Sequence, residues 1–91
     1  MKKVKISIEG RVQGVGFRYT TKQLADHHQV KGTVRNEEDG SVSIEAVGTD
    51  EAVDAFIEKL QNNPAPFSRV EKVTVTEAPS LANFISFKIT N

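Results

Sequence analysis

The sequence contains no cysteine and carries no excess charge of either sign. Without cysteine the chain cannot form disulfide bridges, thiolate zinc sites or a cysteine nucleophile, and this usage is ordinary in the cytosol. Twelve basic and twelve acidic side chains cancel, so the broad positive field that dominates nucleic-acid affinity is missing. The composition therefore predicts a cytoplasmic protein that binds neither nucleic acid nor a membrane surface.

The sequence also lacks any long apolar segment. A membrane-spanning helix needs about 20 apolar residues in a row. An export signal needs a shorter continuous apolar stretch after its basic start, but residues 4–10 alternate between apolar and polar side chains. We therefore expect neither a signal peptide nor a membrane segment, and an N-terminus that already belongs to the fold.

The chain is short, with 91 residues. A chain of this size supports one core and buries roughly 60 to 65% of the surface that its unfolded form exposes. We expect one domain over residues 1–91, with no deep cleft and with a site built on loops at the edge of the core. The ligand, or the part of it that is gripped, is therefore expected to be small, and nothing requires more than a monomer.

Hydrophobic periodicity predicts secondary structure along the whole chain. Alternating apolar residues indicate strands with one buried face, whereas apolar residues spaced three and four apart indicate helices with one buried side. The expected elements are strands at 4–9, 33–36 and 41–47, a helix from Phe17 to near His28 or Gln29, a second helix after Thr49, a strand around Val73 and Val75, and a last strand over 85–89.

Particular residues set the boundaries of these elements. Asp39-Gly40 is a strong hairpin signal between the second and third strands. Thr49 is the expected N-cap of the second helix, and the two prolines of segment 62–66 are expected to end that helix. Three of these patterns name the residues expected to face the core: Val4, Ile6 and Ile8 in the first strand, Val53, Phe56, Ile57 and Leu60 in the second helix, and Ile85, Phe87 and Ile89 in the last strand.

The order of these elements is strand, helix, hairpin, helix and strand, with one further strand at the C-terminus. This order predicts an α+β fold of the ferredoxin-like type, βαββαβ plus a C-terminal strand. Two helices would cover one face of a mostly antiparallel sheet. Sandwiches of this type include RNA binders, metal carriers, regulators and enzymes, so the function must come from particular residues.

The segment 10–18 carries the main functional signal, because a glycine-rich loop passes there directly from a strand into a helix. The first amides of a helix have no intrahelical partner and bind anions readily. Arg18 stands in the first helical turn, where a cation is disfavoured by the helix dipole by about 0.3 to 1 kcal/mol. A bound phosphate would offset this cost by accepting two hydrogen bonds from the guanidinium, which lysine could not reproduce.

Two known phosphate-binding patterns do not fit this loop. The stretch 14–19 ends in Tyr19 where the dinucleotide pattern needs a small residue, and the loop lacks the Gly-Lys-Ser/Thr ending of a nucleotide P-loop. On composition alone, a glycine-rich loop before a helix is most often only a turn. Composition therefore leaves a plain turn and an anion site both open.

Nine consecutive residues, Gly10-Arg11-Val12-Gln13-Gly14-Val15-Gly16-Phe17-Arg18, closely resemble the signature of the acylphosphatase family. The second block of that family is similar to Lys31-Gly32-Thr33-Val34-Arg35-Asn36 with 39–42, and the closing segment 84–89 is similar as well. The blocks stand in the family's order and spacing, and the resemblance extends over essentially the whole chain. It is far more specific than a lone glycine pattern.

The resemblance implies a metal-independent hydrolase that converts small acyl phosphates to a carboxylate and inorganic phosphate without a cofactor. It implies that Arg18 binds the substrate phosphate and that Asn36 orients the attacking water. Phosphoryl transfer needs positioning and electrostatic stabilisation more than covalent chemistry, which agrees with the absence of a nucleophile. Inorganic phosphate or sulfate is expected to inhibit. The backbone amides implied to complete the phosphate cradle are those of Gln13, Gly14, Val15, Gly16 and Phe17.

The residue type of Asn36 does not by itself indicate catalysis, because asparagine beside a hairpin is most often a turn residue. Asn36 shares the parity of Val34 at the end of the expected strand. We expect its amide carbonyl to be open enough there to accept a hydrogen bond from water. An amide is a poor base, so this role would be orientation, with the substrate phosphate as a proton acceptor.

Some residues depart from the family pattern or invite another reading. Thr33 stands where the family commonly has an aromatic residue, which concerns local packing or thermal stability more than chemistry. Glu37 adds a negative charge near the expected anion site, and we expect its side chain to point to solvent. The acidic run 37–39 reads as a solvated turn. His27 and His28 diverge by about 100° on a helix and are not expected to share a metal ion.

Three other functions stay open. An RNA-binding sandwich would display stacking aromatics on its central strands, whereas the residues expected to point outward here are Lys5, Ser7, Glu9, Ser43 and Glu45. A sensor could bind acyl phosphates without turnover. An acylphosphatase-like domain also occurs in carbamoyl-transfer maturation systems, where it is fused to further domains, and carbamoyl phosphate is then a candidate substrate.

Overall fold

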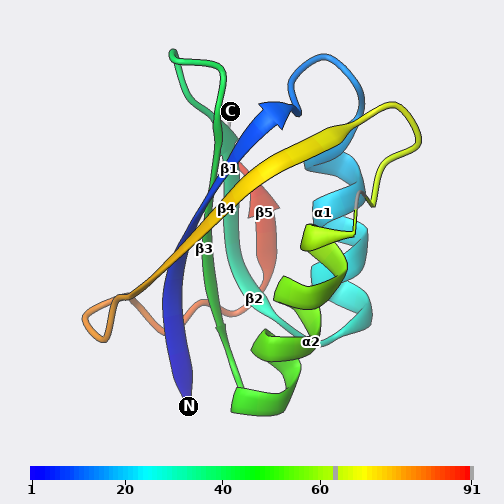
Figure 1. Ribbon diagram of the computed structural model, residues 1–91. Helices are drawn as coiled ribbons and strands as arrows, with labels where there is room; N and C mark the ends of the chain where they lie inside the picture. The colour runs from blue at the N-terminus through cyan, green and yellow to red at the C-terminus, as the bar shows by residue number, and fades with distance from the viewer. Residues whose placement is uncertain (63, 91) are drawn as a thin grey trace.

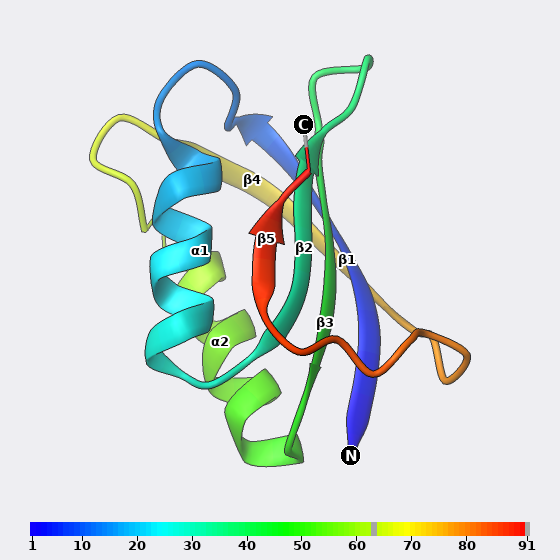
Figure 2. The same ribbon diagram turned by 180° about the vertical axis from the view of Figure 1, so that it is seen from behind.

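The computed structural model describes residues 1–62 and 64–90, which form five strands and two helices. Figure 1 shows both helices on one face of the sheet, and Figure 2 shows the same two layers from behind. This is the ferredoxin-like α+β sandwich that the sequence predicts. The elements in chain order are β1 (Lys2–Arg11), α1 (Phe17–His27), β2 (Lys31–Asn36), β3 (Val42–Gly48), α2 (Asp50–Gln61), β4 (Arg69–Glu77) and β5 (Phe87–Ile89).

The sheet has the strand order β4-β1-β3-β2-β5. β1 pairs antiparallel with β3 and β4, and β2 pairs antiparallel with β3. β5 pairs parallel with β2, so the sheet is mostly antiparallel, as predicted. Because β1 and β2 both oppose β3, and β5 follows β2, the strands β1, β2 and β5 all run toward the same end of the sheet.

The core lies between the sheet and the two helices. As expected, β1 buries Val4, Ile6 and Ile8, all at most 2% exposed. The ring of Phe56 from α2 meets the ring of Phe87 from β5 edge-on, with centroids 6.0 Å apart. Each large apolar side chain buried in this way stabilises the fold by roughly 1.5 to 3 kcal/mol. The helices are therefore held on the sheet mainly by apolar contact.

The second helix follows the prediction closely. The hydroxyl oxygen of Thr49 accepts a hydrogen bond from the amide of Ala52 at 3.1 Å, so Thr49 is the N-cap. α2 ends at Gln61, just before the segment 62–66 that was expected to end it. Residue 63 of that segment lies outside the described residues.

The first helix ends at His27, one residue before the earlier of the two expected ends. Gln29 then adopts a left-handed conformation, with φ of 59°, and the amide of Val30 donates to the carbonyl of Ala25 at 2.8 Å. Such a left-handed residue with a closing hydrogen bond is a common way to end a helix. β2 begins at Lys31, two residues before the expected strand.

The last strand is shorter than predicted, and its expected buried face is wrong at two of three positions. Only Phe87 is buried, whereas Ile85 is 91% exposed and lies before β5, and Ile89 is 40% exposed. β4 and β5 occupy opposite edges of the sheet, so the chain between them must cross to the far edge before it can pair. Ile85 belongs to that crossing, and alternation in the sequence could not indicate where pairing begins.

Candidate active site

Three segments meet at one end of the sheet, because β1, β2 and β5 all run toward it. The loop between β1 and α1, the turn between β2 and β3, and the end of β5 emerge there together, as both views show (Figures 1 and 2). Residues expected to act in catalysis lie in the loop, in the first turn of α1 and at the end of β2. The topology therefore brings the two family blocks to one place.

The loop 12–16 joins β1 to α1 and is anchored at both ends. Val12 and Phe17 are each only 1% exposed, and Val15 packs partly against the core. Between these anchors Gly14 and Gly16 are exposed. The loop thus combines a fixed path with backbone that a small ligand can approach.

The start of α1 has the features of an anion site. Gly16 is the N-cap and adopts a left-handed conformation, with φ of 77°, which glycine tolerates without strain. In the described chain, no side chain caps this helix and no acidic residue lies in its first turn. The first amides of any α-helix lack intrahelical acceptors, and the dipole makes this end partly positive. An anion would satisfy both conditions.

Arg18 lies in this first turn and is half-buried. It lines a hollow of about 200 Å³ together with Gly14 and Gly16 of the loop. The guanidinium offers five N–H donors. Arg18, which was predicted to bind the phosphate, thus lies beside the loop that was predicted to hold it.

Two further residues of this hollow were not expected from the sequence. Tyr19 and Ile89 also line it, and they are 62% and 40% exposed. Tyr19 follows Arg18 directly, which could have drawn attention to it. Ile89 carried no such signal, because it reaches the hollow only through the parallel pairing of β5 with β2.

Asn36 is the last residue of β2, opposite Val42 of β3. It is half-buried, and Val34, two residues earlier on the same strand face, is completely buried. The side-chain oxygen Oδ1 of Asn36 is itself buried, which differs from the expectation that this oxygen is open to water. Among the described residues, those lining the Arg18 hollow do not include Asn36.

The side chain of Gln13 links the loop to the strand end that carries Asn36. Its Nε2 donates to the carbonyl oxygens of Glu37 at 2.8 Å and of Ser41 at 2.9 Å. Glu37 immediately follows Asn36. The sequence indicated only a backbone role for Gln13, because these contacts join positions 24 and 28 residues apart.

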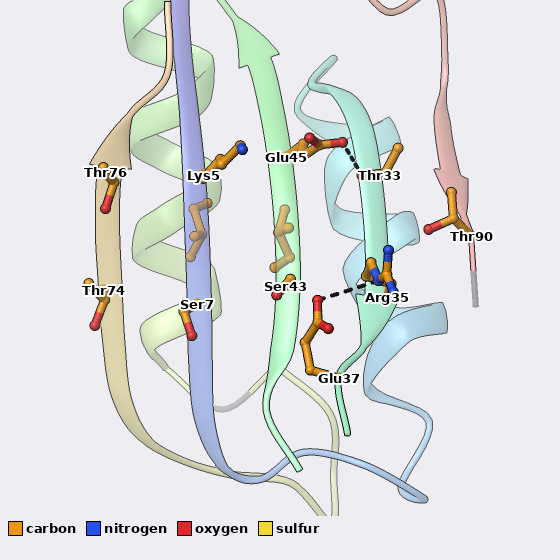
Figure 3. A pocket seen from close by; sticks show the side chains of 12 residues that line it. Lys5, Ser7, Thr33, Arg35, Glu37, Ser43, Glu45, Thr74, Thr76 and Thr90 are labelled. Carbon is orange, nitrogen blue, oxygen red and sulfur yellow. Dashed lines mark hydrogen bonds and ion pairs between the residues drawn. The ribbon is translucent and has the colours of Figure 1, made fainter. Parts of the chain in front are cut away.

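Thr33 and Glu37, the two residues that depart from the family pattern, lie on the opposite face of the sheet, away from the helices (Figure 3). The carboxylate of Glu37 pairs with Arg35, with Oε2 and Nε 3.4 Å apart. Thr33 donates a hydrogen bond to the carboxylate of Glu45 at 2.8 Å. Glu37 therefore points to the outer face, as expected, and its charge is balanced there by a neighbouring cation.

A wider hollow of about 540 Å³ covers this outer face, across the central strands of the sheet. Its labelled side chains in Figure 3 are polar or charged, which agrees with the outward residues predicted from alternation. RNA-binding sheets of this shape use stacking aromatics at such positions. The residues that line the hollow are Lys5, Ile6, Ser7, Thr33, Arg35, Glu37, Ser43, Ile44, Glu45, Thr74, Thr76 and Thr90. The composition of this face gives no support to the RNA-binding reading.

The histidine pair does not form a recognisable metal site. The rings of His27 and His28 pack edge-to-face, with centroids 5.0 Å apart and planes at 86°. Within residues 1–62 and 64–90, no cluster of three or more histidine, aspartate or glutamate side chains is arranged to hold a metal ion. In the same ranges, neither helix has the length and apolar character needed to cross a membrane.

The fold and this end of the sheet define a small α+β protein with an arginine and a glycine-rich loop arranged to bind an anion. A model of the acylphosphatase family matches residues 4–89. The chain is 47% identical to an acylphosphatase from Enterococcus faecalis over 89 residues, which cover 98% of each chain. It is 44% identical to an acylphosphatase from Oceanobacillus iheyensis over the same length. The chain belongs to the acylphosphatase family.

Solved structures agree with this assignment. The crystal structure of acylphosphatase from Bacillus subtilis matches with a TM-score of 0.95 and 42% identity, over all of both chains. Full-length HypF in its phosphate- and nucleotide-bound form matches with a TM-score of 0.88 and 30% identity, over 99% of this chain but only 12% of the HypF chain. The predictions of the family, of the ferredoxin-like fold and of a hydrolase that acts on acyl phosphates are confirmed.

Proposed function

We propose that the chain hydrolyses acyl phosphates by in-line attack of one water molecule on phosphorus. Arg18 and the backbone amides of residues 13–17 hold the phosphate, and Asn36 orients the water. The proposal is carried by the position of Arg18, in the first turn of α1 and on the same hollow as Gly14 and Gly16. A cation in a dipole-disfavoured place beside free helix amides is best explained by a bound anion.

The proposed hydrolysis requires little more than this binding of the phosphate. The water oxygen forms a bond to phosphorus as the bond between phosphorus and the carboxyl oxygen breaks, and a carboxylate leaves. Charge is spread over the phosphate oxygens in the transition state, where Arg18 and the amides stabilise it. The carboxylate is already a good leaving group, so no general acid is needed. Neither a metal nor a cofactor is part of the proposed mechanism.

Asn36 acts by orientation in this scheme. An amide is too weak a base to remove a proton from water, but it can hold the water in line with the bond that breaks. The proton that the water loses passes to an oxygen of the transferred phosphate. The place of Asn36 at the end of β2, where it meets the loop through Gln13 and Glu37, supports this role.

The test measures phosphate release from benzoyl phosphate with a chelator present, for wild type, Arg18→Ala and Asn36→Ala. Arg69→Ala and Asn62→Ala serve as matched controls, because both residues are exposed and lie in β4 and at the end of α2. We expect Arg18→Ala to raise KM and to lower kcat by at least about 100-fold. We expect Asn36→Ala to lower kcat with little change in phosphate binding, and the controls to match wild type.

Competition by inorganic phosphate or sulfate separates the two roles. Inhibition is expected to persist in Asn36→Ala and to be lost in Arg18→Ala. Turnover that neither substitution changes would overturn the mechanism. Phosphate binding without turnover in the wild type would instead favour the sensor reading. Loss of inhibition in both variants would mean that Asn36 shapes the loop and does not place water.

The resemblance to acylphosphatase-like domains of carbamoyl-transfer maturation systems keeps carbamoyl phosphate as a second candidate substrate for the same assay. A rate with carbamoyl phosphate far above that with benzoyl phosphate would favour the maturation-domain reading.

A monomeric state and a cytoplasmic location remain predictions. Sedimentation of the purified chain and fractionation of cells that express it would test them.

A further inference from the structure

The side-chain amide of Gln13 links the loop 12–16 directly to the turn after β2. Nε2 donates to the carbonyl oxygens of Glu37, at 2.8 Å, and Ser41, at 2.9 Å. An amide nitrogen of glutamine carries two hydrogens, so this link uses both of its donors. Both bonds are partly shielded from solvent.

The far end of the link is a hydrogen-bonded turn. The amide of Glu37 donates to the carbonyl of Ser41 at 2.9 Å, which closes the turn. Asn36 pairs with Val42 immediately before that closure. Gln13 therefore attaches to two carbonyls of one closed turn, one of them next to Asn36. A shift of the loop relative to this turn would break two hydrogen bonds at once.

The near end of the link lies inside the phosphate loop. Gln13 follows the buried anchor Val12 and precedes the exposed Gly14, and Arg18 lies in the first turn of α1, five positions after Gln13. Phosphate held by the loop and Arg18 would move with the loop, whereas water held by Asn36 would move with the turn. The distance between the bound phosphate and the water therefore depends on the contacts that join the loop to the turn.

We propose that Gln13 is a positioning residue, whose side-chain amide sets the spacing between the phosphate cradle and Asn36. This role rests on the proposed function, because it matters only if the two groups act on one substrate. In-line attack depends on alignment, and a misplacement of about 1 Å can cost about 100-fold in rate. Loss of the link should therefore impair turnover while phosphate binding, which depends on the loop and Arg18, is kept.

The experiment replaces Gln13 by methionine, which is similar in length and shape but cannot donate a hydrogen bond. We expect kcat for benzoyl phosphate to fall by about 10- to 100-fold in Gln13→Met. The dissociation constant of inorganic phosphate, measured by calorimetry, is expected to change by less than about threefold. This is the split expected for Asn36→Ala, whereas Arg18→Ala is expected to lose both turnover and phosphate binding.

If Gln13 only stabilised the fold, its loss would lower stability without a specific effect on kcat. A destabilising variant far from the site is therefore needed as a control. Thr49→Ala removes the N-cap of α2, and Thr49 lies at the other end of the sheet, where β3 ends. It should lower the melting temperature and leave kcat unchanged at temperatures where the protein is folded. If Gln13→Met does not fold, as judged by circular dichroism, Gln13→Asn replaces it, since its amide is one carbon too short to reach both carbonyls.

Two results would overturn the positioning role. One is a kcat in the folded variant within about twofold of wild type. The other is a phosphate dissociation constant that weakens by the same factor as kcat falls, because Gln13 would then shape the cradle alone. Failure of the proposed function is seen separately, since in that case the wild type itself does not release phosphate from benzoyl phosphate.

Discussion

The carboxylate of Asp39 accepts two hydrogen bonds from Ser41, one from the hydroxyl at 2.6 Å and one from the backbone amide at 2.9 Å. These bonds hold the turn that Gln13 grips from the other side through the carbonyl of Ser41. Hydrogen bonding by the hydroxyl, and then by the amide, lowers the pKa of Asp39 from its ordinary value of 3.8. The acidic turn predicted from the sequence thus has a defined internal structure.

A stability change in acid follows from this pKa. Folding lowers the pKa of Asp39, so its contribution is fully present above the unfolded value of 3.8 and is lost as the pH falls through the lower, folded value. We expect a carbon-detected NMR titration of the Asp39 carboxyl to give a midpoint below 3.8. Ser41→Ala should raise that midpoint, because the hydrogen bond from the Ser41 hydroxyl is the largest cause of the lowered pKa of Asp39. An unchanged midpoint in Ser41→Ala would contradict this account.

Gly10 and Gly16 form a natural pair for a second prediction. Both have positive φ, 130° and 77°, but a Cβ on Gly10 would run into the carbonyl oxygen of Arg69 in β4, whereas a Cβ on Gly16 would meet nothing within 4 Å. We expect Gly16→Ala to cost about 1 to 2 kcal/mol of unfolding free energy from backbone strain alone. Gly10→Ala should cost clearly more, because β4 must also move.

Urea denaturation of both variants measures this difference. The assay with benzoyl phosphate adds a second contrast, since Gly16 lies in the proposed cradle and Gly10 precedes it. Folded Gly16→Ala should bind inorganic phosphate more weakly than wild type. Equal losses of stability in the two variants would show that contact with Arg69 does not constrain Gly10.

The N-cap of α2 gives a third prediction. Thr49→Ala removes the acceptor for the amide of Ala52. The expected loss is about 1 kcal/mol, which lowers the melting temperature of a domain of this size by about 4 to 8 °C. Thr49→Ser keeps a hydroxyl at the same place and should retain most of the stability. If serine and alanine were equally destabilising, the lost hydroxyl could not be the cause.

Arg18→Lys gives a fourth prediction, because it keeps the charge and removes the planar fork. A lysine ammonium is a point charge and cannot donate two parallel hydrogen bonds to two phosphate oxygens. We expect the dissociation constant of inorganic phosphate to rise by at least about tenfold, measured by calorimetry at fixed ionic strength. Lys22→Arg, on the exposed side of α1, is the control and should bind as wild type does. Binding by Arg18→Lys at wild-type strength would mean that charge alone suffices.

Much of the fold could be predicted because local patterns report local geometry. Alternation correctly predicted the buried residues of β1, and the Thr49 cap and its apolar stripe correctly predicted α2. The same alternation failed at Ile85, which is exposed in the crossing between opposite edges of the sheet. Parity along a strand says which residues share a face, but pairing with a neighbour decides whether a strand exists there.

The candidate site divides in the same way. The sequence by itself determined the loop 10–18, the cation at its end and the family, because these are contiguous residues whose chemistry is local. Only the tertiary structure decided that Ile89 lines the hollow, that Oδ1 of Asn36 is buried and that Gln13 spans from loop to turn. Those contacts depend on the parallel course of β1, β2 and β5, which brings distant segments to one end of the sheet.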